Sequence, residues 1–280
     1  MDSGRSRTAI LVAGYRARAT RRPSRICDDP WAELLAGDEG EALSTTYDAM
    51  YPHMELWTAV RTAFIDERVR RATRPPFGIR QVVILGAGLD TRAARLAAPD
   101  VHFFEVDRPA TQQDKLARLG RAASYPRDAA TYVTCNFESE DFVERLLTQG
   151  FRAEEPAFVV WEGVTPYLTE AAVRATLRRI AHGLDPESVV VFDHLRKNIV
   201  LGNVRDAGDL ESRAFVASLG EPLKFGIDHV LPLLYDEGFR RIRTTNFDEA
   251  CLDLTGTYDR ERKFRFQGLA LGSRAAPELP

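Results

Sequence analysis

The chain has 280 residues, 44% of them hydrophobic and 28% charged, and its formal net charge is −3. This size and composition predict one sizeable core, as a single domain with decorations or a domain plus a cap, rather than two full domains. The small negative charge gives no global attraction to nucleic-acid phosphates or anionic membranes, so we expect neither as a partner.

The first 25 residues carry seven arginines and, after Asp2, no acidic residue. This composition is compatible with a transit peptide, but the apolar residues from Ile10 to Ala13 fit a helix that covers a polar site equally well. No apolar run here approaches the ~15 to 20 residues that a membrane span needs, and no signal-peptide pattern is present. We therefore expect neither membrane insertion nor secretion.

The number and spacing of the cysteines indicate the redox state of the cellular compartment. Cys27, Cys135 and Cys251 are far apart, odd in number and without CxxC spacing. This pattern argues for a reducing compartment and against a zinc site. We expect a cytoplasmic protein without a bound metal.

A glycine turn between a strand and a helix is the most informative local pattern. The run Gln81–Leu85 is apolar and rich in β-branched residues, Gly86 and Gly88 interrupt it, and a helical pattern resumes at Thr91. Glycines allow a ligand to approach the backbone closely, and the first amides of the helix point towards it. Asp107 lies 21 residues beyond Gly86, where the next strand ends and an acid accepts hydrogen bonds from ribose hydroxyls. The pattern predicts an adenosine-containing cofactor.

The composition of the turn indicates which cofactor. A dinucleotide fingerprint has a third glycine for helix packing, whereas this chain has Leu89, Asp90 and Thr91 at that place. Asp90 would repel a pyrophosphate but attract a cationic group. S-adenosylmethionine carries a sulfonium and an ammonium group. The turn therefore favours S-adenosylmethionine over a nicotinamide dinucleotide.

Strand patterns alternate with helix patterns along the chain, which predicts an α/β fold with a doubly wound, mostly parallel seven-stranded sheet. The predicted strands are Val82–Leu85, Val101–Val106, Tyr132–Cys135, Ala157–Trp161, Val189–Phe192, Arg240–Asn246 and Phe264–Leu271. Predicted helices include Pro109–Leu119, Asp141–Gln149 and Glu170–His182, the last with Thr169 as N-cap. Residues 194–227 interrupt the alternation above the strand ends, and we expect them to form part of an acceptor pocket. The last eight residues, 273–280, read as a disordered tail.

Several separated segments together resemble the leucine carboxyl methyltransferase family, which uses S-adenosylmethionine and has the Rossmann-like class I methyltransferase fold. The resemblance extends from about Arg61 to Phe247, with a weaker match at Asp28–Leu35. Its segments are RTAFID (61–66), VVILGAGLDTRAARL (82–96), FFEVDRPATQQDK (103–115) and FVVWEGVTPYLTEAAV (158–173). A further match, GEPLKFGID (220–228), resembles the bacterial branch of small-molecule O-methyltransferases, such as the tetracenomycin-type polyketide enzymes.

The resemblance implies a domain division and a set of roles. Residues 1–75 correspond to an N-terminal helical cap that closes over the cofactor, and residues 76–272 to the core. Arg61 matches the arginine that holds the cofactor carboxylate, and Glu162 matches the acid that holds its amino group. A carboxylate after the apolar strand 158–161 is otherwise difficult to explain, because burying it unpaired costs several kcal/mol.

The remaining cofactor contacts combine the turn with the strand ends. Asp107 is expected at the ribose, with Glu105 on the same strand face as a second acid. Asn136 and Phe137 stand where the family has Asp-Leu beside the adenine, and the asparagine can still accept a hydrogen bond through its carbonyl oxygen. The full predicted cofactor set is Arg61, Gly86, Ala87, Gly88, Asp90, Glu105, Asp107, Asn136, Phe137 and Glu162.

The predicted reaction is in-line attack of an acceptor oxygen on the sulfonium methyl, accelerated mainly by orientation. A carboxylate acceptor needs no general base, whereas a phenol or alcohol usually does. His194, at the end of the fifth predicted strand, is our candidate base, with His53 as a second. Tyr167 is a candidate for the acceptor pocket.

The sequence thus favours an S-adenosylmethionine-dependent O-methyltransferase acting on a carboxyl or hydroxyl group of a small molecule, in secondary metabolism. A protein C-terminal carboxyl methyltransferase is the second hypothesis. A non-enzymatic S-adenosylmethionine-binding regulator is the third, and a nicotinamide oxidoreductase the fourth. Neither the acceptor nor the oligomeric state follows from the sequence.

Overall fold

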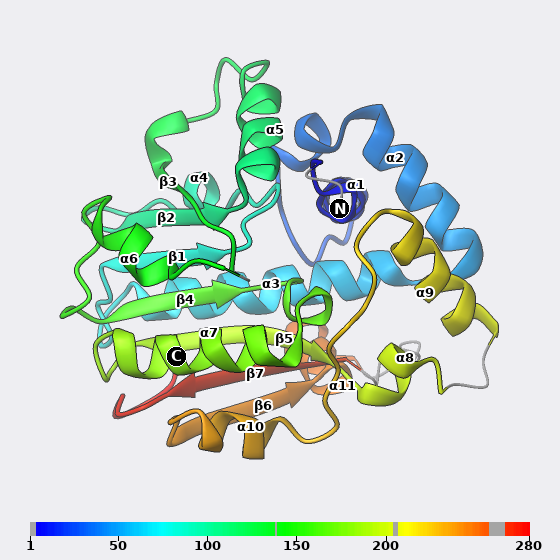
Figure 1. Cartoon of the computed structure of the whole chain (residues 1–280). Helices are drawn as coiled ribbons and strands as arrows, with labels where there is room; N and C mark the ends of the chain where they lie inside the picture. The colour runs from blue at the N-terminus through cyan, green and yellow to red at the C-terminus, as the bar shows by residue number, and fades with distance from the viewer. Residues whose placement is uncertain (1–3, 138, 204–206, 258–266) are drawn as a thin grey trace.

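A seven-stranded sheet organises the computed structural model, which describes residues 4–137, 139–203, 207–257 and 267–280 (Figure 1). Its strands are β1 (Gln81–Leu85), β2 (His102–Asp107), β3 (Ala130–Thr134), β4 (Ala157–Trp161), β5 (Val189–Leu195), β6 (Arg241–Asn246) and β7 (Gln267–Ser273). The strand order is β3-β2-β1-β4-β5-β7-β6, and β7 runs antiparallel to both of its neighbours. The predicted doubly wound, mostly parallel sheet is confirmed. Its order reverses between β1 and β4, where ligands of such sheets bind.

Helices cover both faces of this sheet (Figure 1). The N-terminal helices are α1 (Arg7–Thr20), α2 (Ala32–Met50) and α3 (Met54–Ala72). The later ones are α4 (Arg92–Arg95), α5 (Pro109–Leu119), α6 (Phe142–Leu147), α7 (Glu170–Gly183), α8 (Lys197–Leu201), α9 (Ala207–Ser218), α10 (Val230–Asp236) and α11 (Phe247–Thr255), with the 3-10 turns η1 (Arg127–Ala129) and η2 (Thr165–Tyr167). Side chains of α3 and α11 pack on one face, and those of α6, α7 and α10 on the other.

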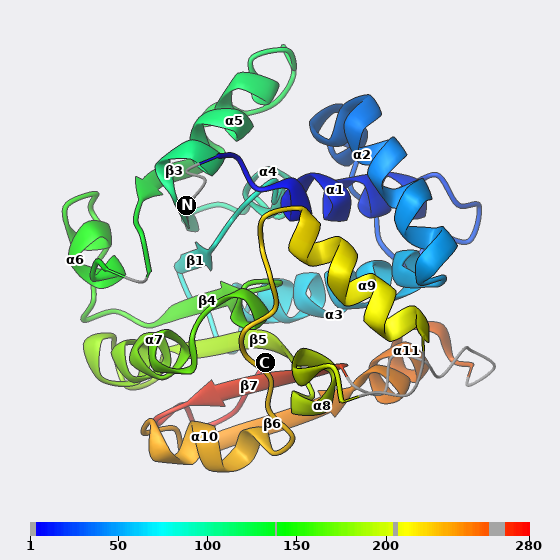
Figure 2. The ribbon, with the colours of Figure 1, turned by 45° about the vertical axis from the view of Figure 1, so that its right-hand side comes forward.

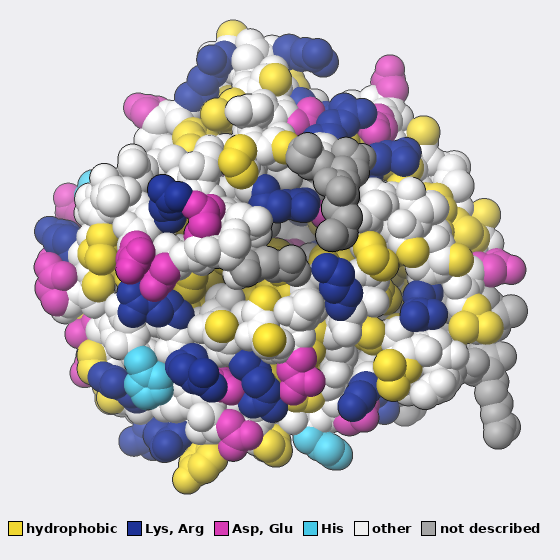
Figure 3. Space-filling view, in the orientation of Figure 1, with side chains coloured by type: hydrophobic (Ala, Val, Ile, Leu, Met, Phe, Trp, Pro, Cys, Tyr) yellow, Lys and Arg dark blue, Asp and Glu magenta, His cyan; other side chains and the backbone are white. Residues whose placement is uncertain are grey.

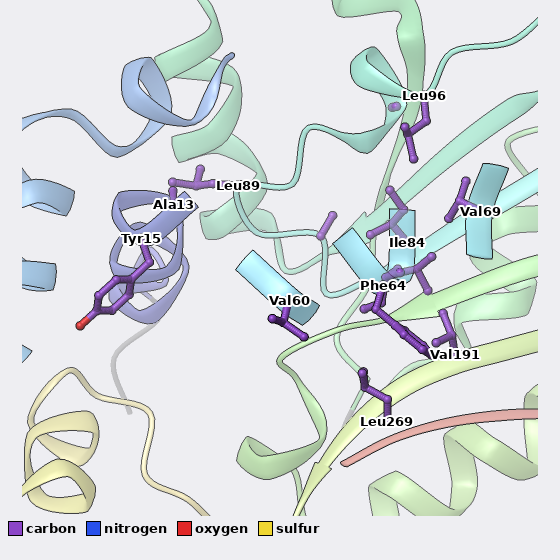
Figure 4. Close-up of a cluster of buried hydrophobic side chains, with 14 of the residues drawn as sticks. Ala13, Tyr15, Val60, Phe64, Val69, Ile84, Leu89, Leu96, Val191 and Leu269 are labelled. Atoms are coloured by element: carbon purple, nitrogen blue, oxygen red, sulfur yellow. The ribbon is translucent and has the colours of Figure 1, made fainter. Parts of the chain in front are cut away.

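Strand alternation divides the core into two clusters, one on each face of the sheet. In β4, Phe158 and Val160 belong to the cluster under α3, whereas Val159 and Trp161 belong to the opposite one. Figure 4 shows side chains of α3, Phe64 among them, directed towards the strands. Because α3 shares a continuous core with the sheet, the boundary expected at residue 75 does not separate two independently packed units.

Several element boundaries follow local chemistry. The side chains of Thr169 and Asp141 accept hydrogen bonds from the first amides of α7 and α6, so the predicted N-cap at Thr169 is confirmed. Strand β5 continues to Leu195, three residues beyond its expected end, because β7 pairs with it along its whole length. The expected start of the last strand, residues 264–266, lies outside the described residues.

The prediction of a disordered tail is wrong. Strand β7 extends to Ser273, and beyond it Ala276 and Leu279 are buried in the same hydrophobic cluster as α3. The amide of Ala275 donates to the carbonyl of Pro186 at 2.8 Å. Two apolar side chains are enough to anchor a short segment whose composition alone suggests disorder. Among the helices of the described residues, none is long and apolar enough to cross a bilayer.

Candidate functional site

The glycine turn after β1 has the geometry that requires glycine. Gly86 and Gly88 have φ values of 67° and 50°, in the left-handed region. A Cβ on Gly86 would lie 2.4 Å from Cγ2 of Val164, and one on Gly88 would lie 3.0 Å from Cβ of Ala9 in α1. The turn is therefore enclosed between the η2 segment and α1.

Asp107 fixes this turn. Its Oδ2 accepts a hydrogen bond from the amide of Gly88 at 2.6 Å, and its Oδ1 accepts one from the amide of Arg108 at 2.7 Å. Burial raises the pKa of Asp107, and these two amides oppose that effect without cancelling it. The carboxylate holds the loop shape, while its contact with ribose stays a prediction.

A cavity of about 170 Å³ lies beside the turn, at the carboxyl ends of β1, β4 and β5. Residues of α1, α2, α3, η2, α8 and α9 form its other walls. Figure 2 shows α9 lying across this end of the molecule, next to α2. Six predicted residues line the cavity: Arg61, Gly86, Ala87, Asp90, Glu162 and Tyr167. The structure thus brings both ends of the predicted methionine site, Arg61 and Glu162, to one place.

A chain of buried ion pairs begins in the cavity lining, at Arg61, Glu162 and Asp193 among others, and continues beneath it; we call it the buried charge cluster. Its links include Arg61 Nε to Glu162 Oε1 at 2.7 Å, Arg61 Nη1 to Asp193 Oδ2 at 2.8 Å and Arg92 Nη1 to Glu162 Oε2 at 2.6 Å. The members are Arg16, Asp29, Arg61, Asp66, Asp90, Arg92, Arg95, Glu162 and Asp193. None of their side chains is more than 9% exposed.

With every member ionised, the cluster carries one negative charge in excess, because four arginines face five carboxylates. Burial alone would raise the pKa of Asp90, but its arginine neighbours, Arg92 first, lower it to about 2. The same competition lowers the pKa of Glu162, through Arg92 and Arg61. Asp193 is the exception, because burial raises its pKa against the effect of Arg61. S-adenosylmethionine, with two positive groups and one carboxylate, has the complementary net charge.

Glu105 does not occupy the predicted position at the cofactor. Its side chain is 1% exposed, outside the cavity lining, and forms an ion pair with Lys115 of α5. Lys115 also donates to the backbone carbonyl of Asp90, so the pair supports the turn from behind. Burial raises the pKa of Glu105 to about 7, against the opposing effect of Lys115. Glu105 and Asp107 lie on the same face of β2, but at Glu105 this face packs against α5. Glu105 therefore contacts Lys115 and not the cavity.

Asn136 and Phe137 lie just beyond β3, also outside the cavity lining. The amide of Asn136 donates to Glu140 Oε2 at 2.8 Å, and the Phe137 ring packs against Phe142 at a centroid distance of 6.2 Å. Their roles at the adenine stay a prediction.

The structure contradicts the assignment of His194 as general base. In β5, Asp193 and Leu195 line the cavity, so the intervening His194 points to the opposite face of the sheet, beside Phe192. Its Nδ1 is buried without a hydrogen-bond partner in the described part of the chain. Burial first, and Arg196 second, lower the pKa of His194 to about 4. His53, the second candidate, is exposed at the start of α3 and does not line the cavity.

We expect His194 to make the stability of the folded protein fall at acidic pH, and not to act in catalysis. Because its pKa falls from 6.5 to about 4 on folding, the unfolded chain binds a proton that the folded protein excludes. This contribution to stability is complete above pH 6.5 and is lost as the pH falls from 6.5 towards 4. Urea unfolding across this range should show a weaker pH dependence in His194→Gln than in the wild type, with exposed His229→Gln as control. Loss of methyl transfer in His194→Gln with normal cofactor affinity would restore the base hypothesis.

Sequence reasoning missed Asp193, Arg92 and the roles of Arg16 and Arg95 in the cluster. Asp193 extends an apolar strand in the same way as the acid after β4, so the signal that found Glu162 was present there too. Arg92 and Arg95 stand three residues apart on α4, which places both on one face. Within the described residues, no group of three or more histidines, cysteines or acids could hold a metal ion.

The loop between α9 and α10 is joined to the start of α1 by Glu221. Glu221 accepts hydrogen bonds from Ser6 Oγ at 2.9 Å and from the amide of Thr8 at 3.3 Å, at the start of α1. Its other oxygen forms an ion pair with Arg108 at 3.2 Å, next to Asp107. Glu221 thus connects α1 both to the loop between α9 and α10 and to the end of β2.

The chain belongs to the leucine carboxyl methyltransferase family, whose model matches residues 9–181. A relative from Parafrankia sp., provisionally named an S-adenosyl-L-methionine-dependent methyltransferase, is 32% identical over 85% of this chain and 78% of its own length. A Mycobacterium bovis protein with the same provisional name is 30% identical over 89% of this chain and 77% of its own. The crystal structure of a provisionally assigned methyltransferase from Thermobifida fusca has the same fold, with a TM-score of 0.67, 16% identity and coverage of 97% and 95% of the two chains.

The protein is therefore an S-adenosylmethionine-dependent methyltransferase, as the family resemblance predicted. The residues present fit this cofactor: two glycines that tolerate no side chain, and a buried charge cluster with an excess negative charge beside them. We expect direct contacts in the cavity, rather than a long-range electrostatic field, to attract the cofactor. Acidic and basic side chains are interspersed on the face that Figure 3 shows.

Proposed function

We propose that the enzyme transfers the methyl group to an oxygen of a small molecule, in cytoplasmic secondary metabolism. The observation that carries the proposal is the apolar wall of the cavity, which adjoins the charge cluster where Trp57 meets Arg61. It is aromatic and aliphatic, formed by Tyr47, Tyr51, Met54, Trp57, Tyr167, Leu195, Ile199, Val216 and Leu223. Such a wall suits a largely apolar small molecule held by a few polar groups.

Orientation supplies most of the catalytic effect in this proposal. The cofactor contributes an electrophilic methyl group on sulfur. Arg61 and Glu162 fix each other by their 2.7 Å hydrogen bond, and Trp57 lies against the Arg61 guanidinium at 5.7 Å. Because these side chains are locked by packing and ion pairs, they hold the methionine end of the cofactor in one position.

A carboxyl oxygen is the acceptor that the lining favours over a hydroxyl oxygen. The described lining of the cavity contains no histidine, and each of its carboxylates, Asp90, Glu162 and Asp193, has an arginine partner. Burial raises the pKa of Tyr167, which disfavours it as a base. With no free base to remove a proton, the acceptor oxygen must already be anionic, as a carboxylate is at neutral pH.

Calorimetry and labelled methyl transfer test the proposal. We expect binding of S-adenosylmethionine and S-adenosylhomocysteine but not of NAD, and label transfer to small aromatic or aliphatic carboxylic acids as base-labile esters. Transfer only to hydroxyl groups would contradict the carboxyl assignment. Transfer only to a peptide that ends in leucine would support a protein C-terminal carboxyl methyltransferase instead. Cofactor binding with no transfer to any acceptor would support the regulatory module.

A further inference from the structure

Arg213 of α9 lines the cavity and has no counter-ion among the residues that the structure describes. Arginines that line the cavity elsewhere are neutralised: Arg16 pairs with Asp29 at 2.9 Å, and Arg61 pairs with Glu162 and Asp193. Arg213 has no ion pair or hydrogen bond from its side chain within the described residues, and its Nε is buried. Arg213 is half-buried, and its enclosed Nε is a donor to which an anionic ligand would supply the missing partner.

Arg213 lies next to three uncharged residues in the described part of the chain, Gly202, Ser212 and Val216. Its guanidinium lies against the backbone at Gly202, where a Cβ would come within 2.9 Å of Nη1 and where the φ of 71° favours glycine. Next to it, Ser212 is already bonded to the hydroxyl of Tyr47 and offers no competing charge. Val216, one turn further along α9, continues the lining as an apolar surface.

The described lining therefore combines Arg213, which is unpaired there, with aromatic rings. Tyr47 and Tyr51 lie with centroids 6.3 Å apart, and together with Trp57 they line the same cavity as Arg213. Flat aromatic ligands pack well on such rings, and a guanidinium recognises a carboxylate through two parallel hydrogen bonds.

We propose that Arg213 is the specificity-determining residue of the acceptor site and that it binds the carboxylate of an aromatic carboxylic acid. This inference rests on the proposed carboxyl methylation and identifies the class of substrate. Arg213 holds and orients the carboxylate by donating hydrogen bonds from its guanidinium, while the aromatic side chains hold the ring.

The chemical step balances without a proton acceptor. One carboxylate oxygen uses a lone pair to form a bond to the methyl carbon, and the carbon–sulfur bond breaks with its electron pair moving to sulfur. The negative charge of the carboxylate and the positive charge of the sulfonium disappear together. The products are a neutral methyl ester and a neutral thioether, and no proton is transferred.

The test compares two ligands of the same shape and different charge, 1-naphthoate and 1-naphthamide, by calorimetry with enzyme saturated with S-adenosylhomocysteine. The wild type should prefer naphthoate. Arg213→Met should weaken naphthoate binding by about 10- to 100-fold, as expected for loss of a charged hydrogen-bonded pair, and leave naphthamide unchanged. Arg213→Lys should recover part of the loss, because it keeps the charge but not the paired donors. Arg152→Met, an exposed arginine in an ion pair with Glu155, is the control and should have no effect.

Equal binding of the two ligands to the wild type, binding of neither, or unchanged naphthoate affinity in Arg213→Met would overturn the proposal. So would loss of S-adenosylhomocysteine affinity in Arg213→Met, since that would place Arg213 at the cofactor. Failure of the proposed function has a different signature. Label transfer to 1-naphthol but not to 1-naphthoate would refute carboxyl methylation, whatever the result of the binding comparison.

Discussion

Replacement of Glu162 by alanine is expected to lower the free energy of unfolding by about 3 to 5 kcal/mol, the usual effect of removing one partner from a buried ion pair. Glu162 is the only described carboxylate that joins Arg61 to Arg92, and its removal leaves both guanidinium groups buried with fewer partners. The same change should abolish measurable S-adenosylmethionine binding in calorimetry. Urea unfolding with and without cofactor measures both effects.

Two variants make this result specific. Glu170→Ala removes an exposed ion pair with Arg174 and should cost less than about 1 kcal/mol. Glu162→Gln keeps the size and hydrogen-bonding oxygen but removes the charge, so cofactor affinity should fall even where the fold survives. If Glu162→Gln bound S-adenosylmethionine normally, the charge of this residue would have no part in binding.

Gly86→Ala is expected to destabilise the protein by about 2 to 4 kcal/mol, from left-handed backbone strain together with overpacking. The added methyl group would meet Val164 at 2.4 Å, and moving that side chain shifts the loop that carries Glu162. Cofactor affinity should therefore fall at least about tenfold, equivalent to about 1.4 kcal/mol. Thermal unfolding and cofactor titration measure the two quantities.

Gly78 provides the matched control for this change. Its φ of 61° is close to the 67° of Gly86, but no atom lies within 4 Å of its Cβ position. Gly78→Ala therefore reports backbone strain alone, about 1 to 2 kcal/mol. The double variant Gly86→Ala/Val164→Ala should recover the overpacking part. Equal effects of Gly78→Ala and Gly86→Ala would show that the contact with Val164 is unimportant.

Local patterns in the sequence were sufficient for the sheet and for part of the site. The apolar strands, the positive-φ glycines and the acid after β4 are each determined within a few residues of chain, and the structure agrees with them. Arg61 lies on a helix far from Glu162 in the sequence, and the family resemblance, rather than local physics, brought the two together.

The incorrect predictions concern residues whose contacts come from distant parts of the chain. His194 was placed at a strand end, but pairing with β7 extends β5, and the alternation of the strand then directs the side chain away from the cavity. Glu105 was correctly placed on the strand face of Asp107, but Lys115 of α5 occupies its carboxylate. Leu279 is anchored by a cluster formed mainly by residues more than 80 positions earlier. Such pairings depend on three-dimensional packing, and no local pattern encodes them.

The excess negative charge of the buried cluster has a consequence for turnover. The methyl donor enters with a net positive charge, whereas the spent thioether that remains after transfer has none. We therefore expect the cluster to attract the reagent more strongly than the by-product, with the difference arising at the moment of transfer. This difference would favour exchange of used cofactor for fresh and so limit product inhibition.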